Sequence, residues 1–407
     1  MGILRILPSV AASLFIVSAL AEFKTSLADE PAKPYWAYQP LTGIAPPGVK
    51  DKSWSKNAID LFVLQKLEAH NLAPNSPADR VVLIRRIFYD LTGLPPTPEE
   101  VDAFVADSAP DAYERWIDRL LSSPRYGEKW GRHWLDLVRF AESNGYERDG
   151  PKPLAWRYRD YVICSFNADK PFDRFIREQL AGDELAHGDP DSIIATGFYR
   201  LGLFDDEPAD PAQARFDELD DIVTTVSQVF LGMTVNCARC HDHKIDPIPQ
   251  ADYYRLLSFF QEIPRFSNDP NPISSSTVTE IAPAQIRSQH EVEDRARAKR
   301  LNEVTTALRR LEDEGVRKMP AQDQRAAEGP ERQQLIRLKL KQFLTSEQIE
   351  DYANLRKELK ALMSAAGTPR DLALSVNHCA VNPGSTYIMI RGNPHAPGKE
   401  VAPAFPT

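Results

Sequence analysis

Helix-start signals that place a proline directly after a capping residue recur along the chain, and they constrain its fold more than any other feature. Residues 76–79 (SPAD) have this form, and residues 97–100 (TPEE) repeat it at the next segment. The chain contains 33 prolines, which gather at element boundaries and linkers, so we expect short helices that stop abruptly. Before residue 380 no convincing run alternates apolar and polar residues, and residues 386–390 form the one good strand candidate. The pattern predicts a mainly α fold: a multi-helix globular domain, a charged helical hairpin and a short tail with one β-strand.

Apolar residues at helical spacing place the helices of the globular domain. The periodicity begins near Ser55, and the helix that starts at residue 76 closes near Gly93. Further helices are expected over residues 111–122, 126–142, 154–167, 171–180 and 215–235. The last of these carries acids in its expected first turns, where carboxylates complement the positive end of the helix dipole. These acids are Asp217, Glu218, Asp220 and Asp221, and a metal site built from them is the alternative interpretation.

The N-terminus has the pattern of a secretory signal peptide over residues 1–28. Arg5 supplies a basic start, an apolar run follows over residues 6–20, and small residues allow cleavage after Ala21 or Ala28. The run is too short to span a bilayer comfortably, and no later segment is apolar enough to cross one. We therefore expect a mature protein without a membrane span, located in the periplasm or secreted.

Composition divides the rest of the chain into successive regions. The expected order is an extended lead-in over 29–54, a helical domain over 55–263, a Pro- and Ser-rich linker over 264–284, a helical hairpin or coiled coil over 285–366, and the start of a truncated C-terminal domain over 367–407. The hairpin's charges are most simply a solvated face, and protein contact through residues 285–366 is the alternative. We expect few contacts between the hairpin and the helical domain, and no partner in this chain for the tail strand.

Charge and cysteine usage exclude some classes of protein. The net charge of -9 at pH 7 argues against nucleic acid as a partner. The 4 cysteines are too few for a disulfide-built scaffold. Cys164 and Cys379 stand alone, whereas the other two lie close together in one motif.

That motif is Cys237-Ala238-Arg239-Cys240-His241, which has the spacing that covalent haem attachment requires. The two thiols add to the haem vinyl groups, and the imidazole of His241 then serves as the proximal ligand of the iron. The sequence therefore predicts one covalently bound haem c, and a function in redox chemistry or electron transfer with a redox partner. Two alternatives stay open: a zinc site that also uses His243, and a disulfide between the two cysteines.

The opposite face of the haem iron needs a second ligand for pure electron transfer, or an open side for catalysis. His133, which lies between Trp130 and Trp134 on an expected helix, is the first candidate for this distal ligand. Its alternative role is that of a core histidine bonded to a carbonyl. Met233 and Met389 are weaker candidates.

A polar cluster over residues 144–159 offers a second candidate site. It contains an amide, a phenol, carboxylates and guanidinium groups, which together suit a sugar or a cation. Its members are Asn144, Tyr146, Glu147, Asp149, Arg157 and Arg159. A hydrogen-bonded connection between helices is the alternative. The competing functions are accordingly a carbohydrate-processing or carbohydrate-binding module, in which the cysteine motif is structural or binds another metal, and an interaction scaffold that uses the hairpin.

Several stretches between residues 54 and 263 together carry a resemblance to a known family. They are IDLFV (59–63), DLTGLPP (90–96), YGEKW (126–130), RHWLD (132–136), SNGYE (143–147), WRYRDYV (156–162), FNADKP (166–171) and residues 237–254. They resemble the planctomycete-type cytochrome-associated family, in its second domain of unknown function (family 1549). The resemblance implies a secreted or periplasmic protein with a cytochrome-like haem motif and no settled reaction. Residues 391–406 resemble the opening of the family's following domain, so the chain is expected to be truncated there.

Overall fold

The computed structural model describes residues 39–185, 189–266, 277–364, 369–376 and 384–406. The chain divides into two units, Met1–Ala78 and Asp79–Thr407, which are described separately. The expected signal peptide, Cys379 and parts of the expected linker lie outside the described residues. No helix within the described ranges is long and apolar enough to cross a bilayer.

The described part of the first unit contains one helix, α2 (Ala58–Ala69). Asn57 caps it, because its side chain accepts from the amide of Asp60 while the Asp60 side chain accepts from the amide of Asn57. The preceding segment is tied to the same helix, since the Lys50 amide donates to Glu68 Oε1 at 2.9 Å. The helical periodicity that begins near Ser55 thus corresponds to α2.

Three helices at the start of the second unit share a small core of their own. α3 (Arg80–Thr92), α4 (Pro98–Ala106) and α5 (Ala112–Leu121) pack around Phe104 and Trp116. The capping box at Thr97 is present as predicted. The predicted start at residue 76 is wrong, because Asp79 caps α3 and its side chain accepts from the Val82 amide. Gly93 ends α3 with φ 71°, the left-handed conformation that glycine adopts without strain.

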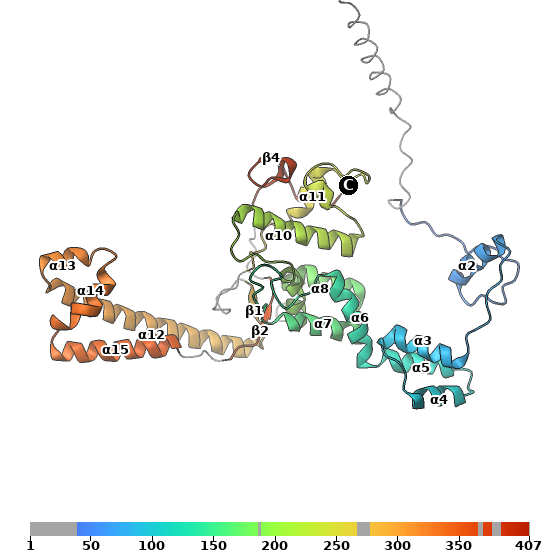
Figure 1. The fold of residues 1–407 in the computed structure, drawn as a ribbon, viewed down its shortest axis with the longest axis horizontal. Coiled ribbons are helices and arrows are strands. Elements are labelled where there is room, and N and C mark those ends of the chain that lie inside the picture. The colour runs from blue at the N-terminus through green and yellow to red at the C-terminus, as the bar shows by residue number, and fades with distance from the viewer. Residues whose placement is uncertain (1–38, 186–188, 267–276, 365–368, 377–383, 407) are drawn as a thin grey trace, which may run out of the picture. The chain divides into compact units, whose positions relative to one another are not determined.

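The main core lies in the middle of the second unit, where the helices pack against one another (Figure 1). The elements are α6 (Pro124–Leu137), α7 (Ala155–Asn167), α8 (Phe172–Leu185), α9 (Pro190–Ala195), the 3-10 turn η2 (Thr196–Arg200), α10 (Pro211–Val226) and α11 (Gln250–Leu257). α6 and α7 approach closely at Gly127, where any side chain would collide with the Ile163 carbonyl. α6 ends earlier than predicted, since Arg139 takes a left-handed conformation with φ 51°.

α10 differs from the helix predicted over 215–235 at both ends. It begins at Pro211, because Asp210 caps it by accepting from the amides of Ala212 and Gln213. It gives way after Val226 to a π-helical turn, η3 (Ser227–Leu231), which Gly232 terminates with φ 65°. The chain then enters the short 3-10 turn η4 (Asn236–Arg239).

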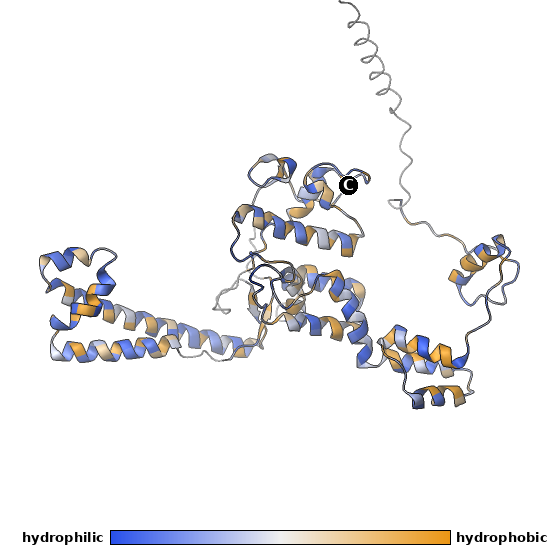
Figure 2. Cartoon of the chain, viewed as in Figure 1, coloured by the Kyte–Doolittle hydropathy of each residue, from blue (hydrophilic) through white to orange (hydrophobic). Residues whose placement is uncertain are grey.

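A long helical projection follows the core (Figure 1). It consists of α12 (Ala284–Arg317), α13 (Ala321–Ala326), α14 (Arg332–Lys339), the 3-10 turn η5 (Leu340–Gln342) and α15 (Ser346–Ser364). α12 and α15 pack side by side, and Arg300 Nε lies 2.6 Å from Glu358 Oε1 across their interface. Hydrophilic residues predominate along both helices (Figure 2). The small tip cluster around Met319, Ile336 and Leu340 supplies the apolar core of this projection.

The described residues form two small antiparallel sheets, one between distant segments and one within a local hairpin. β1 (Val278–Glu280) pairs with β2 (Leu372–Leu374), and β3 (Thr386–Met389) pairs with β4 (Pro397–Val401). The expectation of no strand before residue 380 is therefore wrong, since β1 and β2 precede it. The tail strand also has a partner in this chain, contrary to prediction, because β4 returns beside it. The prediction of a mainly α protein is confirmed.

Candidate functional site

The cysteine motif begins on η4, at the surface of the main core, and Cys240 and His241 directly follow this turn. Val235 and Ala238 are fully buried and anchor the turn, while Cys237 and Cys240 are exposed. Cys237 lies within the turn, and Cys240 is the residue that ends it, with its amide donating to the Cys237 carbonyl. Both thiols are free. The motif therefore presents two free, exposed thiols at the surface of the core.

The side chain of Arg239 holds this turn against α10. Arg239 Nη2 lies 2.8 Å from Asp217 Oδ1, and its Nη1 lies 3.4 Å from Asp220 Oδ2. Tyr253 of α11 donates its hydroxyl to Asp220 Oδ1 at 2.5 Å. Burial, with the neighbouring Asp220 carboxylate, raises the pKa of Tyr253, so its hydroxyl stays protonated as a donor.

The backbone of the same turn is fixed to α11. The Arg239 carbonyl accepts from the Tyr254 hydroxyl at 2.9 Å and from Gln250 Nε2 at 3.0 Å. The N-cap residue of α11, Pro249, has no capping side chain, and Asp242 supplies one: its Oδ1 accepts from the Gln250 amide at 2.8 Å. The motif and α11 thus form one hydrogen-bonded unit.

The two histidines after the cysteines, His241 and His243, differ in the exposure of their rings and in the hydrogen bonds that their Nδ1 atoms make. His243 Nδ1 accepts from the Asp246 amide at 2.8 Å, and its ring is mostly covered. His241 is exposed, and its Nδ1 lies 2.7 Å from the Asp242 carbonyl oxygen. A carbonyl only accepts, so Nδ1 of His241 carries the proton and its Nε2 has a free lone pair in the neutral ring. This is the arrangement in which a histidine ligates a metal through Nε2.

The C-terminal hairpin β3–β4 forms a neighbouring wall of the motif. Gln250 Nε2 donates to the Met389 carbonyl at 3.1 Å as well as to Arg239. Gly392 lies so close that a Cβ built on it would be 2.7 Å from Cys240 Sγ. At the far end of the hairpin, His395 Nε2 lies 2.6 Å from Asp210 Oδ2 at the N-cap of α10. Sequence reasoning missed this wall, because the tail appeared to lack partners.

The sequence-predicted distal ligand is not joined to the motif by any hydrogen bond or ring contact within the described ranges. His133 is exposed on α6, with its ring centroid 5.5 Å from that of Trp130. Its alternative role as a core histidine is therefore wrong. Met389 is buried in the main core, and Met233 is partly buried against it.

The zinc and disulfide alternatives gain no support from the geometry. Within the described parts of the chain, no three side chains of His, Cys, Asp and Glu gather as a metal site would need, and the thiols of Cys237 and Cys240 are unpaired. The acids of α10 bind arginines instead: Asp221 pairs with Arg139, and Glu218 with Arg215 and Arg265. The helix-dipole explanation of these acids is wrong, since none lies in the first turn of α10.

The polar cluster at residues 144–159 is a hydrogen-bonded connection. The backbone N–H of Asn144 donates to the Gly150 carbonyl at 2.8 Å, and the backbone N–H of Gly145 donates to Asp149 Oδ1 at 2.8 Å. Arg157 pairs with Asp371, and Arg159 Nη1 lies 3.0 Å from Glu142 Oε1. Tyr146 and Glu147 are exposed. These bonds favour a connection between helices, although the buried side-chain oxygen of Asn144 and the Nε of Arg157 have no hydrogen-bond partner among the described residues.

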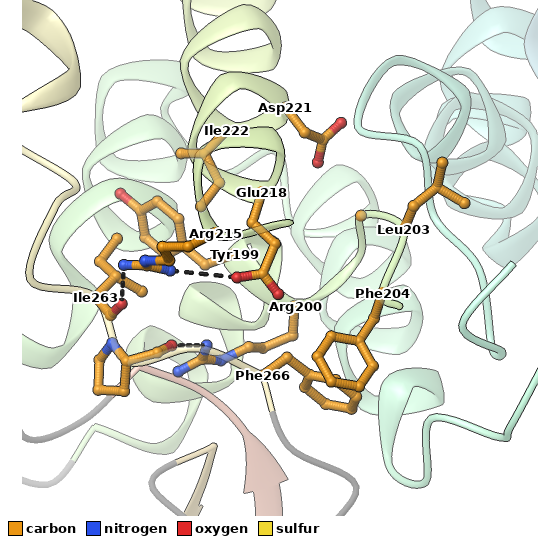
Figure 3. A pocket seen from close by; sticks show the side chains of 12 residues that line it. Tyr199, Arg200, Leu203, Phe204, Arg215, Glu218, Asp221, Ile222, Ile263 and Phe266 are labelled. Atoms are coloured by element: carbon orange, nitrogen blue, oxygen red, sulfur yellow. Dashed lines mark hydrogen bonds and ion pairs between the residues drawn. The ribbon is translucent and has the colours of Figure 1, made fainter. Parts of the chain in front are cut away.

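The charged side chains that line a small cavity beside this connection are bonded to other groups of the protein (Figure 3). Its volume is about 30 Å³, which admits roughly one water molecule. Arg215 donates to the Ile263 carbonyl at 2.6 Å, and Arg200 to the Pro264 carbonyl at 2.6 Å. Burial raises the pKa of Glu218, which faces Arg215 in the cavity. The cavity is too small for a substrate.

Fold and motif together define a mainly helical protein whose surface carries one Cys-x-x-Cys-His turn. A family model described as a protein of unknown function (DUF1549), PSCyt2, matches residues 58–265, just over half of the chain. The chain belongs to this family. No curated protein and no solved structure matches it.

Proposed function

We propose that this protein binds one c-type haem covalently and functions in redox chemistry or electron transfer. Cys237 and Cys240 would form the thioether bonds, and His241 Nε2 would be the proximal ligand of the iron. The observation that carries the proposal is the hydrogen bond between His241 Nδ1 and the Asp242 carbonyl, which leaves Nε2 available beside two free, exposed thiols.

The residues present fit this group by the chemistry of their donors. Covalent haem attachment needs two thiols on one face and one imidazole, and it needs no cluster of three protein ligands. When bound, the haem iron supplies one-electron redox chemistry. The chain's own contribution is positional: the Asp242 carbonyl orients the His241 ring, and Arg239 and Gln250 hold the turn that carries the thiols.

Three finer features belong to the same proposal. Export to the periplasm or beyond rests on the signal-like sequence of residues 1–28, and it suits a protein that acquires covalent haem outside the cytoplasm. His133 is the proposed distal ligand, on the grounds of its exposed imidazole. The redox partner is proposed as a protein, with the exposed motif as the point of electron exchange.

The test is haem content after expression in cells with working haem-attachment machinery. Wild-type protein is expected to keep its Soret band and pyridine haemochrome spectrum through acid–acetone extraction. Cys237→Ser combined with Cys240→Ser removes both signals, whereas Cys164→Ser, which alters an exposed cysteine on α7, leaves both intact. Colourless wild-type protein from a competent host contradicts the proposal.

A further inference from the structure

A haem carries two carboxylate side chains, and these need cationic partners near the attachment site. Arg239, within the motif itself, is already committed: it pairs with Asp217 and Asp220, and only 15% of its side chain is exposed. Its charge is therefore offset by the acids of α10. A carboxylate ligand held at the motif requires a different cation.

The neighbouring hairpin provides one. Gly392 contacts Cys240, and Arg391 directly precedes it, exposed and without an ion pair to any described residue. Arg391 has φ 53° and ψ 31°, a left-handed conformation that side chains with a Cβ rarely adopt. This turn places a long charged residue directly before the glycine that lies against the Cys240 thiol.

We infer that Arg391 is a positioning residue of this site and that its guanidinium binds the carboxylates of the haem. The inference rests on the proposed function. Arginine suits the role because its planar donor pairs match a carboxylate with two parallel hydrogen bonds. The C-terminal hairpin thereby contributes to ligand recognition as well as to covering Cys240.

Lys244, an exposed cation close in sequence to the cysteine motif, is an alternative partner for the haem carboxylates. Lys244 follows His243 in the loop after the motif, and it too has no ion pair with a described residue. A lysine would attract carboxylates as a point charge, without paired donors. Separate substitution of the two residues decides between them.

The experiment compares haem with haem dimethyl ester, whose carboxylates are blocked, as ligands of the reduced full-length apoprotein. In Arg391→Gln the dissociation constant for haem is expected to rise about fivefold, the effect of one exposed ion pair, while that for the ester stays the same. Lys244→Gln and Lys399→Gln, the latter on β4 of the same hairpin, leave both constants unchanged. Equal losses for haem and ester, or a loss in Lys244→Gln instead, overturn the inference.

Two further measurements separate recognition from folding and from the proposed function. Arg391→Gly removes the strained side chain, so its Tm should equal or exceed that of the wild type while its haem affinity falls; a lowered Tm would indicate a structural role and overturn the inference. In the holoprotein, the resonance-Raman bending band of the haem carboxylates should shift in Arg391→Gln. An unshifted band in a protein that carries covalent haem overturns the inference alone, whereas wild-type protein that acquires no haem overturns the proposed function and the inference with it.

Discussion

Two glycines beside the motif share a left-handed backbone but differ in what a side chain would meet. Gly232 has φ 65° with nothing within 4 Å of a built Cβ, whereas Gly392 has φ 72° and faces Cys240 Sγ at 2.7 Å. Gly232→Ala should therefore cost only the backbone strain, about 1 kcal/mol. Gly392→Ala should cost about 1–3 kcal/mol more, because the added carbon overlaps the sulfur.

Urea unfolding of the two variants measures this difference. Under the proposed haem attachment, Gly392→Ala should also lower the fraction of protein with both thioether bonds, measured by mass spectrometry, since Cys240 must move. Gly232→Ala is the matched control for the left-handed conformation. Equal destabilisation of the two variants would mean that the β3–β4 hairpin shifts to accommodate the added carbon at no cost in stability.

A buried lysine gives the stability of the protein a specific pH dependence. Burial lowers the pKa of Lys152 to about 8, and its Nζ donates to the carbonyls of Leu201, at 3.1 Å, and Gly202. Between this value and the ordinary value of 10.5, the unfolded chain binds more protons than the folded one, so the contribution of Lys152 to stability rises with pH. From pH 8 to pH 10 the gain is roughly 2 kcal/mol.

The measurement is the free energy of unfolding of wild type and Lys152→Met at both pH values. Only the difference between the two proteins reports on Lys152, because other groups titrate in the same range. That difference should move in favour of the wild type as the pH rises. Parallel pH profiles would show that the ammonium group is not penalised by burial.

At the scale of helices and strands, a glycine in α12 has an effect opposite to its helix propensity. Gly315 lies in the last turn of α12, and replacing a helical glycine by alanine normally stabilises by up to about 1 kcal/mol. A Cβ at Gly315, however, would collide with the Leu340 side chain, which is fully buried in the tip cluster. Gly315→Ala should therefore destabilise the projection by about 1–3 kcal/mol.

Hydrogen exchange of α12 and α15 amides locates this loss, since the collision lies within the projection. Gly329→Ala serves as the control, because the nearest atom to its built Cβ is the Ala326 carbonyl oxygen at 3.7 Å. It should leave protection and Tm unchanged. A stabilised Gly315→Ala would mean that the tip cluster repacks freely.

Helices were predictable from sequence where local signals decide them. The segments 111–122, 154–167 and 171–180 correspond to α5, α7 and α8, because helical periodicity lies within each segment, although α8 continues to Leu185. The strands β1 and β2 were not predictable: each has 3 residues, and their pairing joins positions far apart in the chain. β4 begins at Pro397 and contains a glycine, so its sequence lacks a strand pattern.

The candidate site was predictable only in its first residues. Spacing alone singles out Cys237, Cys240 and His241 as a candidate site, because it matches the spacing that covalent haem attachment requires. The groups that hold them, such as Gln250 and Gly392, come from other elements, and only the tertiary structure brings them to the motif. The acids of α10 show the same limit, because their arginine partners lie elsewhere in the chain.

At the scale of the whole molecule, the C-terminal segments interlock with the helical core of the second unit. Arg200 Nε donates to the Ser375 carbonyl at 2.9 Å, and the Val376 amide donates to Thr196 Oγ1 at 3.0 Å. Val278 and Leu374 share an apolar cluster with residues of the core, and Met389 belongs to the main core. These contacts bear on whether the segments after the expected linker are separable from the helical domain.

A protease site inserted within residues 267–276 tests this directly. Composition predicts independent pieces on the two sides of the linker, whereas the contacts of residues 371–376 and 386–401 with the core predict that the cleaved fragments stay associated. We expect the two fragments to co-elute in native gel filtration and to separate only in denaturant, because several buried hydrogen bonds and Met389 must be exposed together. Raising the salt concentration should not release them, since the ion pairs of Arg157 with Asp371 and of His395 with Asp210 add to an interface that is otherwise apolar and hydrogen-bonded. Fragments that separate without denaturant would restore the division into independent parts.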